Sequence, residues 1–192
     1  DYPASFFEDR TWRVERRAPD PRRVGEAVAM LKGATRPVVI AGGGVHYSEA
    51  WDELRTFCET LGIPVCETFA GKGAVRRPSA LLLGGHGVTG TPSAAQVVAQ
   101  ADLVICVGTR LADFATGSHS AFQHSDVKFI CVNVDGRDAY KLGALPVVAD
   151  ARETLRALTR EAQAAGVAPN LAYLREVSAA KERWERQMRE EV

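Results

Sequence analysis

The sequence lacks the features that mark several large classes of protein. Its 24 Lys and Arg residues balance 24 Asp and Glu residues, so the formal net charge is zero. Balanced charge gives no attraction to nucleic acid or to an anionic membrane, and we expect neither as a partner. No apolar run approaches the roughly 20 residues that cross a bilayer, and the opening Asp1-Tyr2-Pro3 does not begin a signal peptide. These absences predict a cytoplasmic protein.

Cysteine and histidine are few and widely spaced. The four cysteines form no C-x-x-C pair, and the four histidines show no H-E-x-x-H spacing, so we predict no metal site within this chain. The cysteines fall in or beside apolar strand-like runs or on the apolar face of a helix-like run, where a free thiol acts as a small hydrophobic side chain. The expected core thiols are Cys58, Cys66, Cys106 and Cys131.

Catalytic motifs are also missing. There is no G-x-S-x-G nucleophile turn and no order of Ser, His and Asp that indicates a catalytic triad. A Walker-type phosphate loop fits poorly, because Gly71-Lys72 is followed by Gly73 rather than by Ser or Thr. The residues alone therefore assign no catalytic group.

What the sequence does contain is an alternation of strand-like and helix-like runs. The 46% hydrophobic and 25% charged residues are those of an average globular domain. Apolar runs rich in Val and Ile alternate with amphipathic runs, which predicts an α/β fold, a Rossmann-like parallel sheet of five or six strands flanked by helices. We expect a linker over residues 1–20, this domain over 21–165 and a C-terminal linker helix over 166–192.

Individual helices have recognisable starts and faces. Asp20 before Pro21 and Thr91 before Pro92 are typical helix N-caps, and Ser48 is expected to cap the helix that follows the first strand. The last helix carries only a narrow apolar stripe, which indicates a helix that is either exposed or in contact with a partner. The stripe consists of Leu174, Val177, Trp184 and Met188.

The chain is organised around the glycines Gly42, Gly43 and Gly44, which connect a β-branched strand to a helix-like run. They match the first two glycines of the dinucleotide motif G-x-G-x-x-G, with Tyr47 in place of the third. Three residues without a Cβ allow close approach of the backbone, either to a phosphate or to another part of the protein. Both interpretations remain open at this stage.

Other candidate ligand contacts follow other strands, and in a parallel sheet the carboxyl ends share one edge. Gly108, Thr109 and Arg110 offer backbone N–H groups and a possible phosphate clamp, and Asp135 could accept a ribose hydroxyl. The alternatives are a salt bridge between Arg110 and Asp113, and a turn closed by the Asp135 side chain.

The order and spacing of several motifs resemble the central domain of thiamine-diphosphate-dependent enzymes over about residues 20–165. Within that superfamily, GVHYSEA (44–50), DFATGS (113–118) and KLGALP (141–146) look like the ring-opening hydrolases of inositol catabolism, the 3D-(3,5/4)-trihydroxycyclohexane-1,2-dione hydrolases. The motifs that carry the wider resemblance are GKGA (71–74), LGGHG (83–87), ADLV (101–104), GTRLAD (108–113), NVD (133–135) and PVVADA (146–151).

The resemblance implies a full-length enzyme that uses thiamine diphosphate (thiamine pyrophosphate) and magnesium to break a C–C bond of the cyclic diketone, giving 5-deoxy-glucuronate. The cofactor would supply the difficult chemistry. The activating glutamate and the Gly-Asp-Gly…Asn motif of the family's pyrimidine- and pyrophosphate-binding domains are not in this chain. We therefore expect the 192 residues to be inactive alone, with those flanking domains as partners in a homo-oligomer.

A second interpretation is the FAD- or ADP-binding central domain of an acetolactate-synthase-like enzyme. The stretches Gly42–Gly44 and Gly108–Asp113 match positions near such ligands. FAD-binding relatives tend to read Arg-Phe-Asp-Asp-Arg-Val-Thr-Gly, whereas residues 110–117 here replace the first acid and the second arginine. The site would then be a retained or vestigial nucleotide site, and a purely structural domain is the other possibility.

Overall fold

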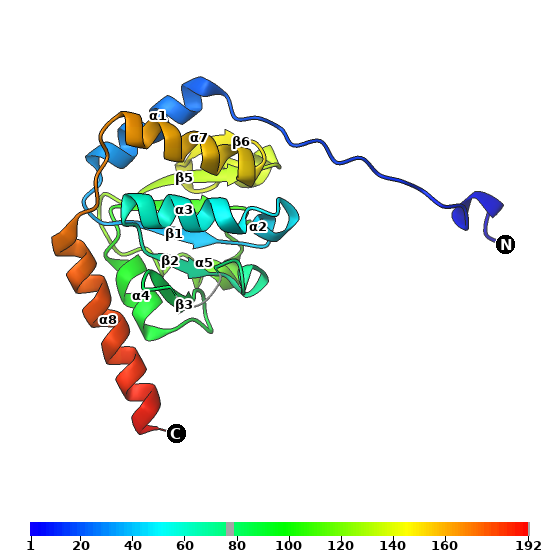
Figure 1. The fold of residues 1–192 in the computed structure, drawn as a ribbon. Coiled ribbons are helices and arrows are strands. Elements are labelled where there is room, and N and C mark those ends of the chain that lie inside the picture. The colour runs from blue at the N-terminus through cyan, green and yellow to red at the C-terminus, as the bar shows by residue number, and fades with distance from the viewer. Residues whose placement is uncertain (76–78, 192) are drawn as a thin grey trace.

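The structure is a computed structural model that describes residues 1–75 and 79–191. Six parallel strands form one sheet with the order β3-β2-β1-β4-β5-β6 (Figure 1), which confirms the predicted fold class. The chain winds outward from β1 in one direction and from β4 in the other, so the direction of the connections changes between these two strands. The strands are β1 (Pro37–Ala41), β2 (Val65–Glu67), β3 (Leu82–Gly85), β4 (Leu103–Val107), β5 (Lys128–Asn133) and β6 (Leu145–Val148).

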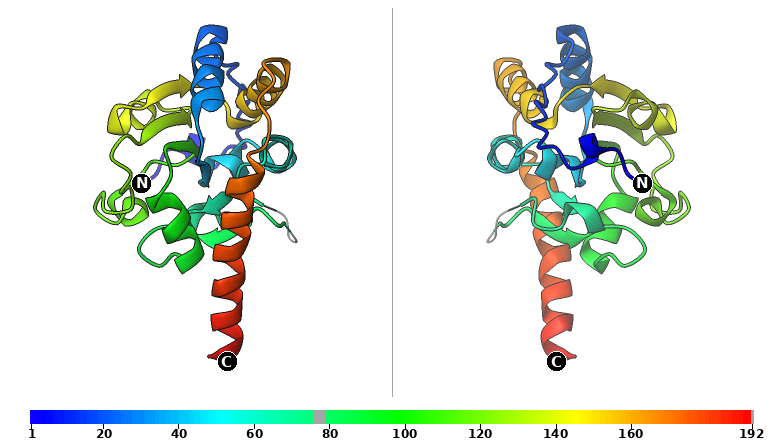
Figure 2. Two further views of the ribbon diagram at one scale, coloured as in Figure 1. Left: turned by 90° about the vertical axis from the view of Figure 1, so that its left-hand side faces the viewer. Right: turned by 90° about the vertical axis from the view of Figure 1, so that its right-hand side faces the viewer.

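Helices cover both faces of the sheet. The first face is covered by α1 (Pro21–Gly33), α3 (Trp51–Leu61) and α7 (Ala151–Ala164), and the second by α4 (Pro92–Ala99) and the first half of α8 (Leu171–Glu190). Figure 2 shows α3 and α7 on one side and α4 on the other. Short helices follow the strands at the carboxyl edge or lie in the arm, and they are η1 (Ala4–Phe6), α2 (Gly44–Tyr47), η2 (Phe69–Gly71), α5 (Asp113–Thr116), α6 (Gly136–Ala139) and η3 (Lys141–Gly143).

Most of the long helices begin where the sequence indicates. The Asp20 side chain accepts a hydrogen bond from the Arg22 N–H, and the Thr91 side chain accepts one from the Ala94 N–H, so both predicted N-caps are confirmed. The prediction for Ser48 is wrong. The chain forms α2 from the third glycine onward, and α3 begins after Ala50 without a side-chain cap. The Ser48 hydroxyl instead accepts a hydrogen bond from the N–H of Ala151.

Alternate strand residues face two separate cores, as expected for a sheet covered on both sides. The second core contains a row of paired residues across four strands, three of them cysteines. Cys66 pairs with Ile40, Ile40 with Cys106, and Cys106 with Cys131. All four cysteines are free and buried, which confirms the predicted core thiols, and burial raises the pKa of Cys58 and Cys66 well above the usual range.

Helix α8 is part of the body over its first half. Tyr173, Val177 and Ala180 are buried against the second face, and the Tyr173 hydroxyl donates a hydrogen bond to the Pro37 carbonyl oxygen (3.1 Å). The buried stripe therefore overlaps the predicted one at Val177, whereas Met188 is exposed. The division of the chain at residue 165 stays a prediction.

Residues 1–15 form an extended arm in which every residue is exposed (Figure 1). The arm is attached to the body by Arg16. Its guanidinium donates hydrogen bonds to the Ser48 carbonyl oxygen (2.6 Å), to the Asp150 carboxylate (3.2 Å) and to the Glu49 carboxylate (3.0 Å). None of the helices described here is long and apolar enough to cross a membrane.

The amino ends of the central strands are tied together by Asp102. Its carboxylate accepts hydrogen bonds from the Thr35 N–H (2.7 Å), the Thr35 hydroxyl (2.6 Å) and the Arg36 N–H (2.9 Å). Burial alone would raise the pKa of Asp102, but the hydrogen bonds from Thr35 and Arg36 hold it below its ordinary value. The Asn170 side chain donates to the Thr35 carbonyl oxygen (3.2 Å), so α8 is joined to the same cluster.

The two outer strands are poorly suited to pairing with a further strand. The Ala149 N–H donates to the Asn133 carbonyl oxygen (3.0 Å), so by alternation the nitrogen of Pro146 in β6 faces away from β5, and it carries no hydrogen to donate. At the other side, β3 has only four residues, ends in Gly84-Gly85 and shifts register against β2.

Candidate functional site

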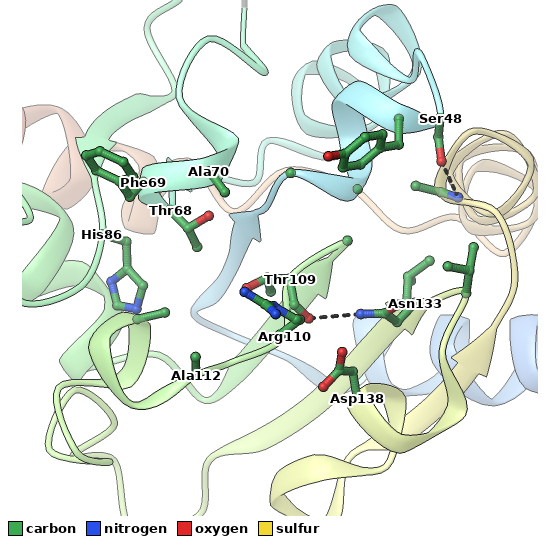
Figure 3. Close-up of a pocket in the computed structure, with 18 of the residues that line it drawn as sticks. Ser48, Thr68, Phe69, Ala70, His86, Thr109, Arg110, Ala112, Asn133 and Asp138 are labelled. Atoms are coloured by element: carbon green, nitrogen blue, oxygen red, sulfur yellow. Dashed lines mark hydrogen bonds between the residues drawn. The ribbon is translucent and has the colours of Figure 1, made fainter. Parts of the chain in front are cut away.

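A pocket of about 730 Å³ lies at the carboxyl edge of the sheet, with walls from the turns after β1 and β4 (Figure 3). This is where the direction of the connections changes, the usual ligand position in open α/β sheets. The segments after β2, β3, β5 and β6 complete its walls. Five of the eight sequence-predicted site residues line it, namely Gly43, Gly44, Gly108, Thr109 and Arg110.

The glycine turns interlock with each other. A Cβ added at Gly42 would overlap the Gly108 carbonyl oxygen and lie 2.7 Å from the Thr109 Cα, and one added at Gly44 would lie 2.6 Å from the Gly108 Cα. The Gly44 N–H donates to the Gly108 carbonyl oxygen (2.9 Å), and Gly108 has φ +61°. Close backbone packing thus accounts for Gly42, Gly44 and Gly108 without any ligand.

Arg110 supplies the only Lys or Arg side chain among the residues described around the pocket. Asp138 also lines the pocket and forms an ion pair with Lys141 (2.7 Å), whose ammonium also donates to the Arg110 carbonyl oxygen (2.7 Å). The salt bridge between Arg110 and Asp113 that the sequence allowed is not formed in the described part of the chain, and Asp113 does not line the pocket. The guanidinium of Arg110 is therefore available to a ligand.

Asp135 lies outside the pocket and closes a local turn. Its carboxylate accepts hydrogen bonds from the Arg137 N–H (2.9 Å) and from the Arg137 guanidinium (2.8 Å), and it caps α6. The hydrogen bonds from Arg137 hold the pKa of Asp135 below its ordinary value. The structure thus contains the Asx turn that was the alternative to a ribose contact.

His86 is a site residue that sequence reasoning missed. It follows β3, lines the pocket and is only 6% exposed, and its Nε2 is the one buried side-chain nitrogen or oxygen without a hydrogen-bond partner in the described residues. Burial lowers the pKa of His86 to about 4, so the ring is uncharged at neutral pH. A buried polar atom without a protein partner, beside a cavity, can hydrogen-bond a molecule that enters the cavity. The signals that could have identified it are its position at a strand end and its place in the motif LGGHG (83–87).

Large apolar side chains stand exposed on the turns and short helices that follow the strands, and we call them the rim. Tyr47 is 91% and Phe69 85% exposed, and the others also exceed half exposure. Sequence reasoning missed the rim because its members are scattered over separate loops. The rim consists of Tyr47, Phe69, Val88, Phe114, Val134 and Tyr140.

Backbone strain gathers at the same edge. Five non-glycine residues in the described segments have positive φ, which costs free energy for residues with a Cβ. Four of them follow β1 or β4, and the fifth, Leu142, lies in η3 between β5 and β6. They are Glu49 (51°), Leu111 (46°), Ser118 (54°), His119 (67°) and Leu142 (58°).

The fold and this edge place the chain in a known class. A family model described as thiamine pyrophosphate enzyme, central domain, matches residues 24–158, and the chain belongs to that family. Curated relatives with which it shares sequence are named 3D-(3,5/4)-trihydroxycyclohexane-1,2-dione hydrolase. They include a protein of Bacillus cereus, named hydrolase 2 and 45% identical over 188 residues, and proteins of Bacillus anthracis and Bacillus thuringiensis (strain Al Hakam), each 44% identical over 188 residues.

These matches cover 98% of the chain but 29% of each relative, so the chain spans about 29% of the length of the curated relatives it matches. The resemblance to the family, predicted from motifs alone, is confirmed. The likeness to the named hydrolases extends beyond the matched domain into residues 1–20 and 166–192, because almost the whole chain is aligned.

The residues of this chain do not fit thiamine diphosphate with Mg²⁺, the cofactor that the family implies. Magnesium with a diphosphate needs oxygen ligands gathered at one point. In residues 1–75 and 79–191 there is no group of three or more His, Cys, Asp or Glu side chains that could hold a metal ion, and the one acid of the pocket, Asp138, is paired with Lys141. We therefore assign no catalytic step to this chain.

Proposed function

We propose that the whole polypeptide is a thiamine-diphosphate-dependent hydrolase that opens the ring of 3D-(3,5/4)-trihydroxycyclohexane-1,2-dione to 5-deoxy-glucuronate in myo-inositol catabolism. The observation that supports this most is the 44–45% identity, over 98% of the chain, to proteins with that name. Membership of the central-domain family gives the cofactor class. The enzyme would act in the cytoplasm, as its metabolic role implies.

In this proposal the chain is the central, structural domain of the enzyme. Thiamine diphosphate and Mg²⁺ bind the flanking pyrimidine- and pyrophosphate-binding domains of the same protein, and the assembly is a homo-oligomer. The chain sets the spacing of those domains through residues 21–165, with 1–20 and 166–192 as connecting segments. The lack of a metal-binding cluster in the described residues is consistent with this division of roles.

The test is a ring-opening assay with thiamine diphosphate, Mg²⁺ and the diketone. We expect turnover by the whole polypeptide and none by the 192-residue chain. A full-length protein that binds the cofactor but leaves the diketone intact would refute the substrate assignment. Ring opening by the 192-residue chain alone would refute its structural role.

A second candidate function is nucleotide binding in the pocket, as in an FAD- or ADP-binding central domain. Two observations favour it, the partnerless Nε2 of His86 and the available guanidinium of Arg110 on the same pocket. Arg110 can bind a phosphate, and the neutral His86 ring can hydrogen-bond an uncharged group. The backbone of Gly43, Gly44 and Gly108 with Thr109 would line the ligand, whereas Gly42, Asp113 and Asp135 would not contact it.

A thermal-shift titration of the whole polypeptide with FAD, ADP, NAD and coenzyme A tests this second function. A ligand at about 100 times its Kd should add roughly 2.7 kcal/mol and raise the melting temperature measurably. Arg110→Met and His86→Phe should abolish the shift, whereas Arg175→Met, an exposed arginine on α8, should retain it. A shift that survives Arg110→Met, or no shift with any nucleotide, would leave the glycines with a packing role only.

A further inference from the structure

Exposed large hydrophobic side chains are concentrated on one side of the molecule. Thirteen are exposed in the described residues, and two of them, Leu171 and Met188, lie on α8. Six form the rim, all in the turns and short helices that follow strands. The remaining five lie in the arm and are Tyr2, Phe6, Phe7, Trp12 and Val14. Loops at the amino ends of the strands contribute none in the part of the chain that the structure describes.

The rim is too wide for a small molecule to cover. Its members follow five of the six strands: Tyr47 follows β1, Phe69 follows β2, Val88 follows β3, Phe114 follows β4, and Val134 and Tyr140 follow β5. Neighbouring strands in a sheet are about 4.8 Å apart, so this set spans about 20 Å. A nucleotide in the pocket would reach the inner faces of some of these side chains and leave the outer faces of Tyr47 and Phe69 in water.

The arm is attached at this same edge. Arg16 binds the carbonyl oxygen of Ser48, which lines the pocket, and the carboxylate of Asp150, which directly precedes α7 at the carboxyl end of β6. A backbone hydrogen bond attaches the arm at the same place: the Asp150 N–H donates to the Arg17 carbonyl oxygen (2.9 Å). In Figure 1 the arm leaves the body on the side where α2 and α5 lie. The arm therefore starts at the edge that carries the rim, and from there it extends away from the body (Figure 1).

We infer that the rim and the arm form a docking surface for another domain of the same polypeptide, which presents an apolar face to them. Large exposed apolar side chains gathered at one edge of a domain are typical of an interaction site. This inference rests on the proposed function as one domain of a larger enzyme. The chain spans about 29% of its relatives, so the remaining polypeptide of such an enzyme is large enough to supply the cover.

Docking would also close the pocket. Tyr47, Phe69 and Phe114 line the pocket and belong to the rim (Figure 3 shows Phe69 at one wall). A domain that covers the rim then covers the mouth, and the pocket becomes a cavity between two domains. Binding sites are frequent at such domain boundaries.

The experiment is site-resolved maleimide labelling of the full-length protein. Tyr47→Cys and Phe69→Cys place a thiol on the rim, and Lys32→Cys places one at an exposed position on α1, at the opposite edge of the sheet. The labelling rate of each site in the folded protein is divided by its rate in urea, which corrects for differences in the reactivity of the thiol itself. Peptide mass spectrometry distinguishes the introduced cysteines from the native ones, which are buried. We expect both rim sites to label about ten-fold or more slowly than Lys32→Cys, because the docked domain must move away from the rim before the reagent can reach them.

Labelling of both rim sites at the rate of Lys32→Cys would overturn the inference. Protection that disappears on dilution to the monomer would also overturn it, because the cover would be a second copy. Protection that is seen only after FAD or ADP is added would also overturn the inference, because a bound ligand would then be what covers the rim. The ring-opening assay is independent of labelling, so protected rim sites in a protein without that activity would refute the proposed function and retain the docking surface.

Discussion

The two edges of the sheet are built from the same six strands but in opposite ways. At the amino edge, three hydrogen bonds link the loop before β1 to Asp102, which directly precedes β4. A hydrogen bond from Asn170 links α8 to the same loop. At the carboxyl edge, His86 has a buried nitrogen without a partner in the described residues, four residues after β1 and β4 have strained φ, and large apolar side chains face water.

This difference between the two edges indicates that the amino edge stabilises the fold and the carboxyl edge is the side suited to binding. Satisfied polar groups and ordinary backbone angles at the amino edge hold the sheet together. Unsatisfied, strained and apolar groups at the carboxyl edge cost stability and are expected where another molecule or domain will bind. The following predictions test this contrast in order of decreasing effect.

The largest effect is expected at the crossing of the two glycine turns. In Gly42→Ala the new Cβ would overlap backbone atoms of Gly108 and Thr109, which cannot move without displacing the ends of β1 and β4. We expect a loss of about 4 kcal/mol in the free energy of unfolding, typical of severe overpacking. Urea denaturation followed by circular dichroism measures it.

Gly25→Ala is the matched control, because a Cβ at this position in α1 meets nothing within 4 Å. It should raise the free energy of unfolding by about 0.5–1 kcal/mol through helix propensity. Equal stability of Gly42→Ala and the wild type would show that the turns can separate, and the phosphate interpretation of these glycines would regain support.

The second effect concerns the amino edge. Asp102→Ala leaves the N–H groups of Thr35 and Arg36 without their acceptor, and we expect a loss of about 2–3 kcal/mol. The pKa of Asp102 is lowered in the folded protein, so its contribution is complete above the ordinary carboxyl pKa of about 3.9 and disappears as the pH falls through the folded value. Denaturation at pH 7 and below pH 4 should show the difference shrinking, and a difference that grows in acid would contradict this account.

The third effect is a pH dependence caused by His86. Its pKa falls from 6.5 to about 4 on folding, so between these values the unfolded chain binds the proton more readily and stability declines as the pH falls. At pH 5 the penalty is about 2 kcal/mol relative to pH 7. His86→Phe should remove that part of the slope in parallel urea titrations while leaving stability at pH 7 unchanged or higher. An unchanged slope in the variant would show that His86 titrates normally.

The smallest effect is expected on the rim. Tyr47→Ser removes an aromatic ring that is 91% exposed, so the free energy of unfolding of the 192-residue chain should change by less than about 0.5 kcal/mol. The measurement is again urea denaturation. A loss above about 1 kcal/mol would mean that the ring stabilises this body itself, and the proposed separation between the two edges would weaken.

The fold was largely predictable because its signals are local. Val38, Val39 and Ile40 form a short β-branched run between turn residues, and Asp20 and Thr91 precede proline at the starts of helices. Each of these patterns has one favoured structure. The predicted N-cap role of Ser48 was wrong because the short helix α2 begins within the glycine run and has Ser48 as its C-cap. No local sequence pattern distinguishes a residue that ends one helix from a residue that begins the next.

The candidate site was only partly predictable because its decisive features arise between distant segments. The position of Gly43, Gly108 and Arg110 at one edge follows from parallel strands, and the structure places them together. Gly42 packs against Gly108 because two turns 66 residues apart in the sequence meet in the fold. That the His86 Nε2 has no hydrogen-bond partner among the described residues can be recognised only when the positions of all its neighbours are known. Asp135 was ambiguous because the same local sequence serves a turn or a ribose contact.

The outer strands decide how this domain can assemble. Pro146 turns a nitrogen without hydrogen outward from β6, and β3 is short and irregular at the other side. Neither side offers the row of free backbone groups that lets sheets of separate molecules join into one continuous sheet or a fibril. Oligomers of this protein should therefore form through side chains of its helices and loops, and its sheet should end where the domain ends.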